Sequence, residues 1–176
     1  YIYGCKPVAD LATANNSTDL RIIGYGAVWR MWRNEYVAKC KHSEFRMGLS
    51  INHGEGITIA GLTIRESGGD GIIILSTMGN QKAGSTQRVL IQDVVLDRNY
   101  RQGLSVISAS DMLILNTTFS NTNGTAPSNG VDLEPDSSMD SSNPLRLSNI
   151  TFRDCRAINN SGAGFGGYLL HAVSPV

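Results

Sequence analysis

Two acidic side chains lie two residues apart in the segment Asn129–Asp136, which has the sequence NGVDLEPD. Val131 and Leu133 alternate there with Asp132 and Glu134, and this alternation predicts a strand with one buried face. Both carboxylates then lie on the same face, with Cα atoms ~6.6 Å apart. Their mutual repulsion raises the pKa of one of them. A general acid beside a general base needs this arrangement, so Asp132 and Glu134 are the first catalytic candidates.

Composition limits the partners that these residues can have. The 176 residues predict one domain, and 17% charged with 41% hydrophobic residues is typical of a globular chain. The formal net charge is zero, which gives no indication of nucleic acid or an anionic membrane as a partner. No apolar run approaches the ~20 residues of a membrane span. We therefore expect neither nucleic acid nor a membrane as a partner.

The acidic segment belongs to a repeat that is marked by glycines. Each glycine precedes a short strand, and successive glycines lie 23 to 34 residues apart. The glycines are Gly48, Gly71, Gly103, Gly130 and Gly164. The first four open in-out-in triplets, namely LSI, III, LSV and VDL, and the fifth opens the degenerate triplet FGG.

A second pattern follows in each repeat, with apolar or small residues at relative positions 0, 2, 5 and 7. The step of three residues between positions 2 and 5 interrupts the period of two, and it predicts a corner between two strands. The four copies are Ile57, Ile59, Leu62, Ile64; Val89, Ile91, Val94, Leu96; Met112, Ile114, Thr117, Phe119; and Leu145, Leu147, Ile150, Phe152. The corner residues are then Gly61, Asp93, Asn116 and Asn149, and we expect the asparagines to form an inward-facing ladder.

Three short strands per repeat, with no helical periodicity, predict an all-β parallel β-helix of about five coils. We expect residues 1–46 to form an irregular capping segment with an incomplete first coil, and residues 47–176 to form the coils. Both ends should be uncapped, and an uncapped end exposes strand edges. We expect further solenoid sequence or neighbouring copies to stack on the C-terminal end.

Three segments, GGDGIIIL, NYRQGLSVISASDMLILNTTFSNT and NGVDLEPD, resemble the right-handed parallel β-helix proteins of the pectate-lyase-like superfamily. The resemblance covers roughly residues 20–170. That superfamily includes polysaccharide lyases, glycoside hydrolases, uronate epimerases, phage tailspikes and non-catalytic members. The resemblance implies that a glycan binds along the face of the sheet formed by the first strands, and it leaves the reaction open.

Stacked coils bring two further charged residues towards the acidic pair. Asp70 lies two coils below Asn129, and Arg101 lies one coil below it. Carboxyl groups ≈6.5–9.5 Å apart suit an inverting hydrolase, so Asp132, Glu134, Asp70 and Arg101 are our catalytic candidates. The polar residues at the strand entries and on the outer face predict substrate binding: Arg46, Gln102, Asn129, Ser105 and Asn52.

A lyase or epimerase needs a base and a cation that neutralises a sugar carboxylate. The acidic residues would repel such a substrate unless Ca²⁺ lay between them, and Asp136 with Asp132 and Glu134 offers oxygen ligands for that ion. Hydrolysis requires no cofactor. Two non-catalytic alternatives also stay open, which are glycan binding without turnover and a structural solenoid that stacks into a larger assembly or fibre.

Cysteines and sequons predict a secreted protein. Cys5 and Cys40 both precede the regular repeats and can pair as a disulfide, which leaves Cys155 over. Four asparagines stand in N-glycosylation sequons within expected loops, namely Asn15, Asn16, Asn123 and Asn159. Asn116 and Asn149 also stand in sequons, but inward-facing ladder residues would not accept a glycan.

Overall fold

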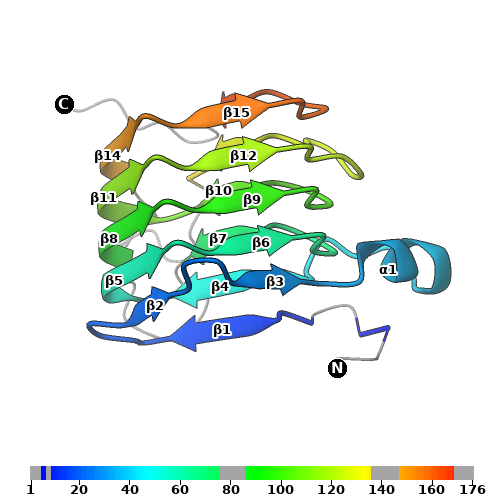
Figure 1. Ribbon diagram of the computed structural model, residues 1–176, viewed down its shortest axis with the longest axis horizontal. Helices are drawn as coiled ribbons and strands as arrows, with labels where there is room; N and C mark the ends of the chain where they lie inside the picture. The colour runs from blue at the N-terminus through cyan, green and yellow to red at the C-terminus, as the bar shows by residue number, and fades with distance from the viewer. Residues whose placement is uncertain (1–4, 7–8, 76–85, 136–146, 169–176) are drawn as a thin grey trace.

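The computed structural model describes residues 5–6, 9–75, 86–135 and 147–168, and these residues form a right-handed parallel β-helix. Figure 1 shows the coils stacked from the N-terminus to the C-terminus, with three parallel sheets along their sides. The predicted fold is therefore confirmed. Described residues form five coils with a strand in every sheet, and β16 begins a sixth.

Each sheet takes one strand from each coil. The first sheet contains β1 (Ala12–Asn15), β4 (Leu49–Asn52), β7 (Ile72–Leu75), β10 (Leu104–Val106), β13 (Val131–Leu133) and β16 (Phe165–Gly167). The second contains β2 (Arg21–Ile23), β5 (Glu55–Ala60), β8 (Thr86–Gln92), β11 (Ala109–Leu115) and β14 (Leu147–Arg153). The third contains β3 (Val28–Arg30), β6 (Thr63–Arg65), β9 (Val95–Asp97), β12 (Thr118–Ser120) and β15 (Arg156–Ile158).

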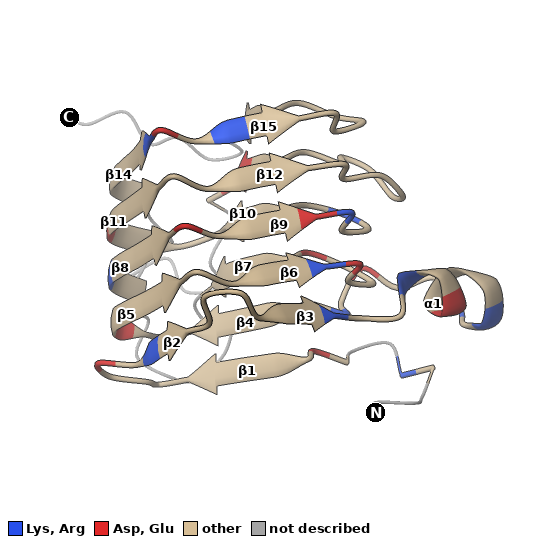
Figure 2. Cartoon of the chain, in the orientation of Figure 1, with Lys and Arg blue, Asp and Glu red and all other residues tan. Residues whose placement is uncertain are grey.

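Alternate residues of these strands point inward and form one apolar core along the solenoid axis. Isoleucine and leucine predominate in it, as β-branched and aliphatic residues do on pleated, buried surfaces. Phe119 is fully buried in the fourth coil and contacts the rings of Phe152 and Phe165 edge to face. Charged residues lie mainly at strand ends and in turns, which leaves the strands largely uncharged (Figure 2).

The repeating glycines stack as predicted, because each coil approaches the next most closely at these positions. A Cβ atom on Gly103 would lie 2.4 Å from the Gly130 carbonyl oxygen. On Gly71 it would lie 2.7 Å from the Gly103 carbonyl oxygen, and on Gly130 it would lie 2.6 Å from that of Gly164. Since no side chain fits in such a gap, these positions require glycine.

The corners of each coil are made by residues in the left-handed region. Asparagine and aspartate tolerate this conformation better than other residues with a Cβ atom. Two sets of equivalent residues have φ between +42° and +69°: Gly56, Arg88, Asp111 and Asn149 within the second-sheet strands, and Gly61, Asp93, Asn116 and Asp154 after them.

The pairing of β14 with β11 shows that the predicted register of the last coil is wrong. Ile150 pairs with Met112 and Phe152 pairs with Ile114, so the fourth copy of the pattern begins at Ile150. The prediction placed it five residues earlier, with its first member, Leu145, outside the described residues. The physical reason is that each coil has two left-handed breaks five residues apart, so the pattern also matches itself after a shift of five.

The predicted inward ladder of asparagines is also wrong. Asn116 and Asn149 are exposed, because the left-handed corners direct these side chains outward. Asn116 Nδ2 donates to Asp93 Oδ1 at 2.7 Å, and Asn149 Nδ2 donates to Asp111 Oδ1 at 2.6 Å. These asparagines link neighbouring coils across the surface of the solenoid, so burial does not exclude glycosylation there.

Between β3 and β4 the chain leaves the solenoid and forms α1 (Arg33–Lys39), which projects from its side (Figure 1). A disulfide joins Cys5 and Cys40, whose Cα atoms are 5.0 Å apart. Arg33 donates to the carbonyl oxygens of Arg98 and Asn123 and so attaches the helix to the third and fourth coils.

Apolar side chains stay partly exposed in the terminal coils. Ile23 and Val28 in the first coil are 56% and 57% exposed, and Ile158 and Phe165 at the C-terminal end are 50% and 51% exposed. These side chains belong to β2, β3, β15 and β16, each of which is an edge strand of its sheet. The described end coils therefore combine strand edges with apolar surface.

Candidate functional site

A ladder of hydrogen bonds runs along the entries to the first-sheet strands, and it includes three of the predicted site residues. We call the residue two positions before each of these strands the entry residue. Its side chain accepts a hydrogen bond from the backbone N–H of the entry residue in the next coil. The pairs are Asp10 with Met47 N, Met47 with Asp70 N, Asp70 with Gln102 N, Gln102 with Asn129 N and Asn129 with Ala163 N.

Each entry residue also faces a residue of the first-sheet strand in the next coil. That residue is the second of its strand, and its side chain points outward. Ser50 Oγ donates to Asp10 Oδ2 at 2.6 Å, and Gln102 Nε2 donates to Asp132 Oδ2 at 2.6 Å. Ser105 holds the outward position above Asp70. In both hydrogen-bonded pairs, a donor on one coil faces an acceptor on the neighbouring coil, so polar side chains on the outward face of the first sheet are paired between coils.

Asp70 is the most perturbed of these groups. It is fully buried, and burial raises the pKa of its carboxyl group to about 7. Arg101, whose Nη1 lies 3.4 Å from Asp70 Oδ2, opposes the rise in pKa, as do Ser105 and the Gln102 amide, while Asp132 reinforces it. Asp70 is consequently protonated in a large fraction of molecules at neutral pH.

Asp132 lies two coils further along and is 1% exposed. Burial raises the pKa of its carboxyl group, and the neighbouring Glu134 raises it further, while Arg101 and Asn129 lower it. Glu134 follows β13 and is partly exposed. The structure thus brings Asp70, Arg101, Asp132 and Glu134 into one electrostatically coupled group, which we call the acidic cluster.

Among the described residues, several buried polar atoms in and beside this cluster have no hydrogen-bond partner. They are Asp70 Oδ1, Asp132 Oδ1, Ser105 Oγ and Asn129 Nδ2. Buried polar atoms without partners are rare, because each costs ~1–3 kcal/mol of stability. Ser105 and Asn129 nevertheless lie close enough to Asp70 and Asp132 to lower the pKa of those carboxyl groups. These atoms lie on successive coils of one sheet face, and because all four residues are buried, they support the cluster from behind rather than contact a ligand.

The predicted substrate-binding residues fall into different environments. Gln102, Asn129 and Ser105 are buried in or beside the ladder. Arg46 is 2% exposed and donates to the carbonyl oxygens of Lys6 and Lys41 beneath α1, which is a structural role. Asn52, at the end of β4, is partly exposed. Arg101 and Glu134 are therefore the members of the acidic cluster with surface that a ligand can contact.

No metal centre is formed by the residues that the structure describes, because they contain no group of three or more potential ligands in suitable positions. Asp136, which we predicted as a Ca²⁺ ligand with Asp132 and Glu134, lies outside the described residues. The sequon residues Asn15, Asn16, Asn123 and Asn159 are all exposed. Within the described part of the chain, no helix has the length and apolarity required to cross a membrane.

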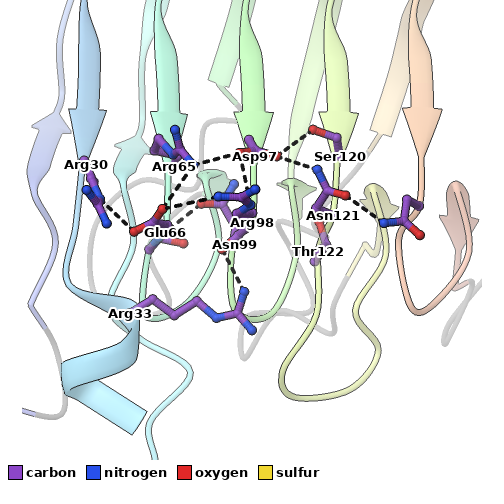
Figure 3. A network of polar contacts seen from close by, with 12 residues as sticks. Arg30, Arg33, Arg65, Glu66, Asp97, Arg98, Asn99, Ser120, Asn121 and Thr122 are labelled. Carbon is purple, nitrogen blue, oxygen red and sulfur yellow. Dashed lines mark hydrogen bonds and ion pairs between the residues drawn. The ribbon is translucent and has the colours of Figure 1, made fainter. Parts of the chain in front are cut away.

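A second polar network, which the sequence analysis did not identify, lies at the corner after the third sheet. Figure 3 shows it running from Arg30 through Glu66, Arg65 and Asp97 to Asn121. Arg30 Nε lies 2.7 Å from Glu66 Oε2, and Arg65 contacts both Glu66 and Asp97. The sequence contains a signal for this network, because its polar and charged residues follow the last inward residue of each repeat by one or two positions.

Comparison with known proteins agrees with this architecture. Residues 26–171 match the family described as right handed beta helix region. No curated protein and no solved structure matches the chain. The match extends over most of the chain and includes the three-sheet repeat, the glycine stack and the coils of the acidic cluster, so the chain belongs to the right-handed β-helix family.

Proposed function

We propose that this chain is an extracellular, polysaccharide-active β-helix protein related to the pectate-lyase-like superfamily. Its glycan binds on the first-sheet face at the acidic cluster of Asp70, Arg101, Asp132 and Glu134. The resemblance of three segments to that superfamily suggests the ligand class. The chemistry of the cluster suggests which residues contact it.

One observation supports this proposal above the others. Between the second and third coils, the same ladder step is made by Met47 and Ile73, which are 3% and 6% exposed. The fold therefore accepts an apolar pair at this position. Burying carboxylates in the later coils instead reduces stability, since a buried ionised group with incomplete pairing costs several kcal/mol. Residues that reduce stability where the fold does not need them suggest a binding or catalytic role.

The arrangement suits general acid–base chemistry on a glycosidic bond. Glu134 and Arg101 have exposed surface and would contact the glycan, while Asp70 and Asp132 lie behind them. Glu134 would act on the glycosidic bond directly, and Asp132 behind it, with its raised pKa, would exchange a proton with Glu134. Arg101 would orient the sugar. A lyase or epimerase would use the same residues with Ca²⁺ between the carboxylates and a uronate.

The test measures turnover and binding on a panel of neutral and uronate polysaccharides. Asp132→Asn and Glu134→Gln should each abolish turnover, or glycan retention if the protein only binds, without a loss of thermal stability. The matched control is Asp10→Asn, which changes a ladder carboxylate in the first coil, outside the acidic cluster. Unchanged activity in both cluster variants would refute the proposal, and absorbance by unsaturated products would distinguish a lyase from a hydrolase.

Secretion is part of the same proposal. A disulfide between Cys5 and Cys40 is stable in oxidising compartments, and the four exposed sequon asparagines are accessible to glycosylation. Expression in a secreting eukaryotic host followed by glycosidase treatment should reduce the apparent mass. A protein that leaves the host without a glycan on Asn15, Asn16, Asn123 or Asn159 would contradict the glycosylation component.

A second candidate function is a structural solenoid that stacks end to end. It is favoured by the exposed Phe165 and Ile158 at the C-terminal end and by the strand edges beside them. Sedimentation velocity should then show concentration-dependent association that Phe165→Glu abolishes. A monomer at all concentrations would exclude this candidate.

A further inference from the structure

A cavity of about 540 Å³ lies where α1 leaves the solenoid. Its lining includes Arg30 from the first coil, Trp32, Asn34 and Glu35 at the start of α1, and Glu66 from the corner after β6. The volume falls within the ~300–1,000 Å³ of typical small-molecule sites. The cavity is separate from the acidic cluster, which lies on the first-sheet face of the third to fifth coils.

The lining combines one large aromatic surface with several planar polar groups. Trp32 is 46% exposed at the start of α1, although tryptophan is usually highly buried. Asn34 is exposed, and Glu35 is partly exposed on the same helix. An indole face contacts the apolar C–H face of a pyranose ring, while amide, carboxylate and guanidinium groups form paired hydrogen bonds with neighbouring hydroxyls.

The walls of the cavity are held in place. Arg33 attaches α1 to the carbonyl oxygens of Arg98 and Asn123, and its guanidinium lies 5.7 Å from the Tyr100 ring centroid. Within the lining, Arg30 forms its ion pair with Glu66 (Figure 3). A site whose walls are already positioned loses less conformational entropy when a ligand binds.

The charges of the lining indicate which sugars fit. Among the described residues that line the cavity, Arg30 is the one cationic side chain, and Glu66 pairs with it at 2.7 Å. Glu35 adds a second carboxylate. Arg65 and Arg98 also contact Glu66, at 3.1 Å and 4.0 Å, and both contact Asp97. The cations around the described lining are therefore already paired with carboxylates and attract a uronate little, whereas a neutral sugar needs only the hydrogen-bonding groups.

From the aromatic platform, the planar polar groups and this charge balance, we propose that the α1 cavity is a binding site for a neutral saccharide unit. Trp32 stacks against the sugar ring, and Asn34, Glu35 and Arg30 bind its hydroxyl groups. The site extends the reach of the protein to a part of the glycan other than the one at the acidic cluster. It does not require the acidic cluster to be catalytic.

Saturation-transfer NMR tests the proposal with three neutral trisaccharides, cellotriose, xylotriose and mannotriose, and with trigalacturonate as the charged comparison. At least one neutral trisaccharide should bind, and Trp32→Ala should weaken that binding about tenfold or more, which corresponds to ~1.4 kcal/mol. Asn34→Ala should also weaken it, and this exposed residue can be changed if Trp32→Ala fails to fold. Phe45→Ala is the matched control, because Phe45 is a 54% exposed aromatic outside the lining.

The outcomes separate this site from the acidic cluster. Asp132→Asn should leave trisaccharide binding unchanged even if it abolishes every activity of the protein. Four results would overturn the proposal: no neutral trisaccharide binds, folded Trp32→Ala and Asn34→Ala proteins bind as the wild type does, trigalacturonate binds most tightly, or Asp132→Asn removes the signal.

Discussion

The stability of the protein should depend on pH through Asp70, and the dependence can be worked out from its environment. The carboxyl group is fully buried in the folded protein, which raises its pKa from 3.8 to about 7. Below about pH 4, Asp70 is protonated in both the folded and the unfolded chain, and no penalty arises. Between about pH 4 and pH 7, the unfolded chain releases its proton while the folded chain retains it.

The free energy of unfolding therefore falls as the pH rises through this window. The rise of about 3 pKa units corresponds to at most about 4 kcal/mol, at 1.36 kcal/mol per unit. Asp70→Asn imitates the protonated carboxyl, and its amide oxygen can still accept the hydrogen bond from the Gln102 amide. We expect the Asp70→Asn protein to be more stable than the wild type by up to about 4 kcal/mol at about pH 8, and nearly equal to it at about pH 4.

Urea unfolding followed by circular dichroism at a series of pH values measures this difference, with m compared between variants to confirm that the unfolded states match. Asp10→Asn is the control, since Asp10 occupies the same ladder position in the first coil and accepts from Met47 and Ser50. A stability difference between Asp70→Asn and wild type that stays constant from about pH 4 to about pH 8 would refute the reasoning.

Three further predictions concern the coils and the excursion. The double change Gln102→Met and Asp132→Ile copies the apolar step between the second and third coils. It should raise the free energy of unfolding, measured with urea, by ~1–4 kcal/mol and abolish glycan activity. A lower free energy of unfolding would show that the fold needs the polar pair. Gly103→Ala should prevent or strongly weaken folding, because its Cβ would lie 2.4 Å from the Gly130 carbonyl oxygen, and a melting temperature within a few degrees of wild type would contradict this. Cys40→Ser removes the disulfide that closes a loop of 35 residues, so thermal melting should show a free energy of unfolding lower by up to ~4 kcal/mol. The trisaccharide signal at the α1 cavity should also weaken. An unaltered signal would show that the disulfide does not position α1.

Local patterns in the sequence were sufficient to predict the architecture. Gly71, Gly103 and Gly130 lie one above another because the close approach of coils is a backbone requirement that recurs with every turn. The triplets after them alternate inward and outward, and this period of two does not depend on distant contacts. For the same reason, Ser105 and Asp132 could be assigned in advance to one outward column.

Only the tertiary structure decided the register of the last coil, since a pattern with two equivalent left-handed breaks cannot identify its own starting point. It also decided the environment of the candidate site. The sequence places Asp70 and Gln102 at strand entries, but the neighbouring coil determines that their side chains accept hydrogen bonds from its backbone and are buried there. Burial and ionisation depend on atoms from residues 23 to 34 positions away, and only the stacking of coils brings those atoms together.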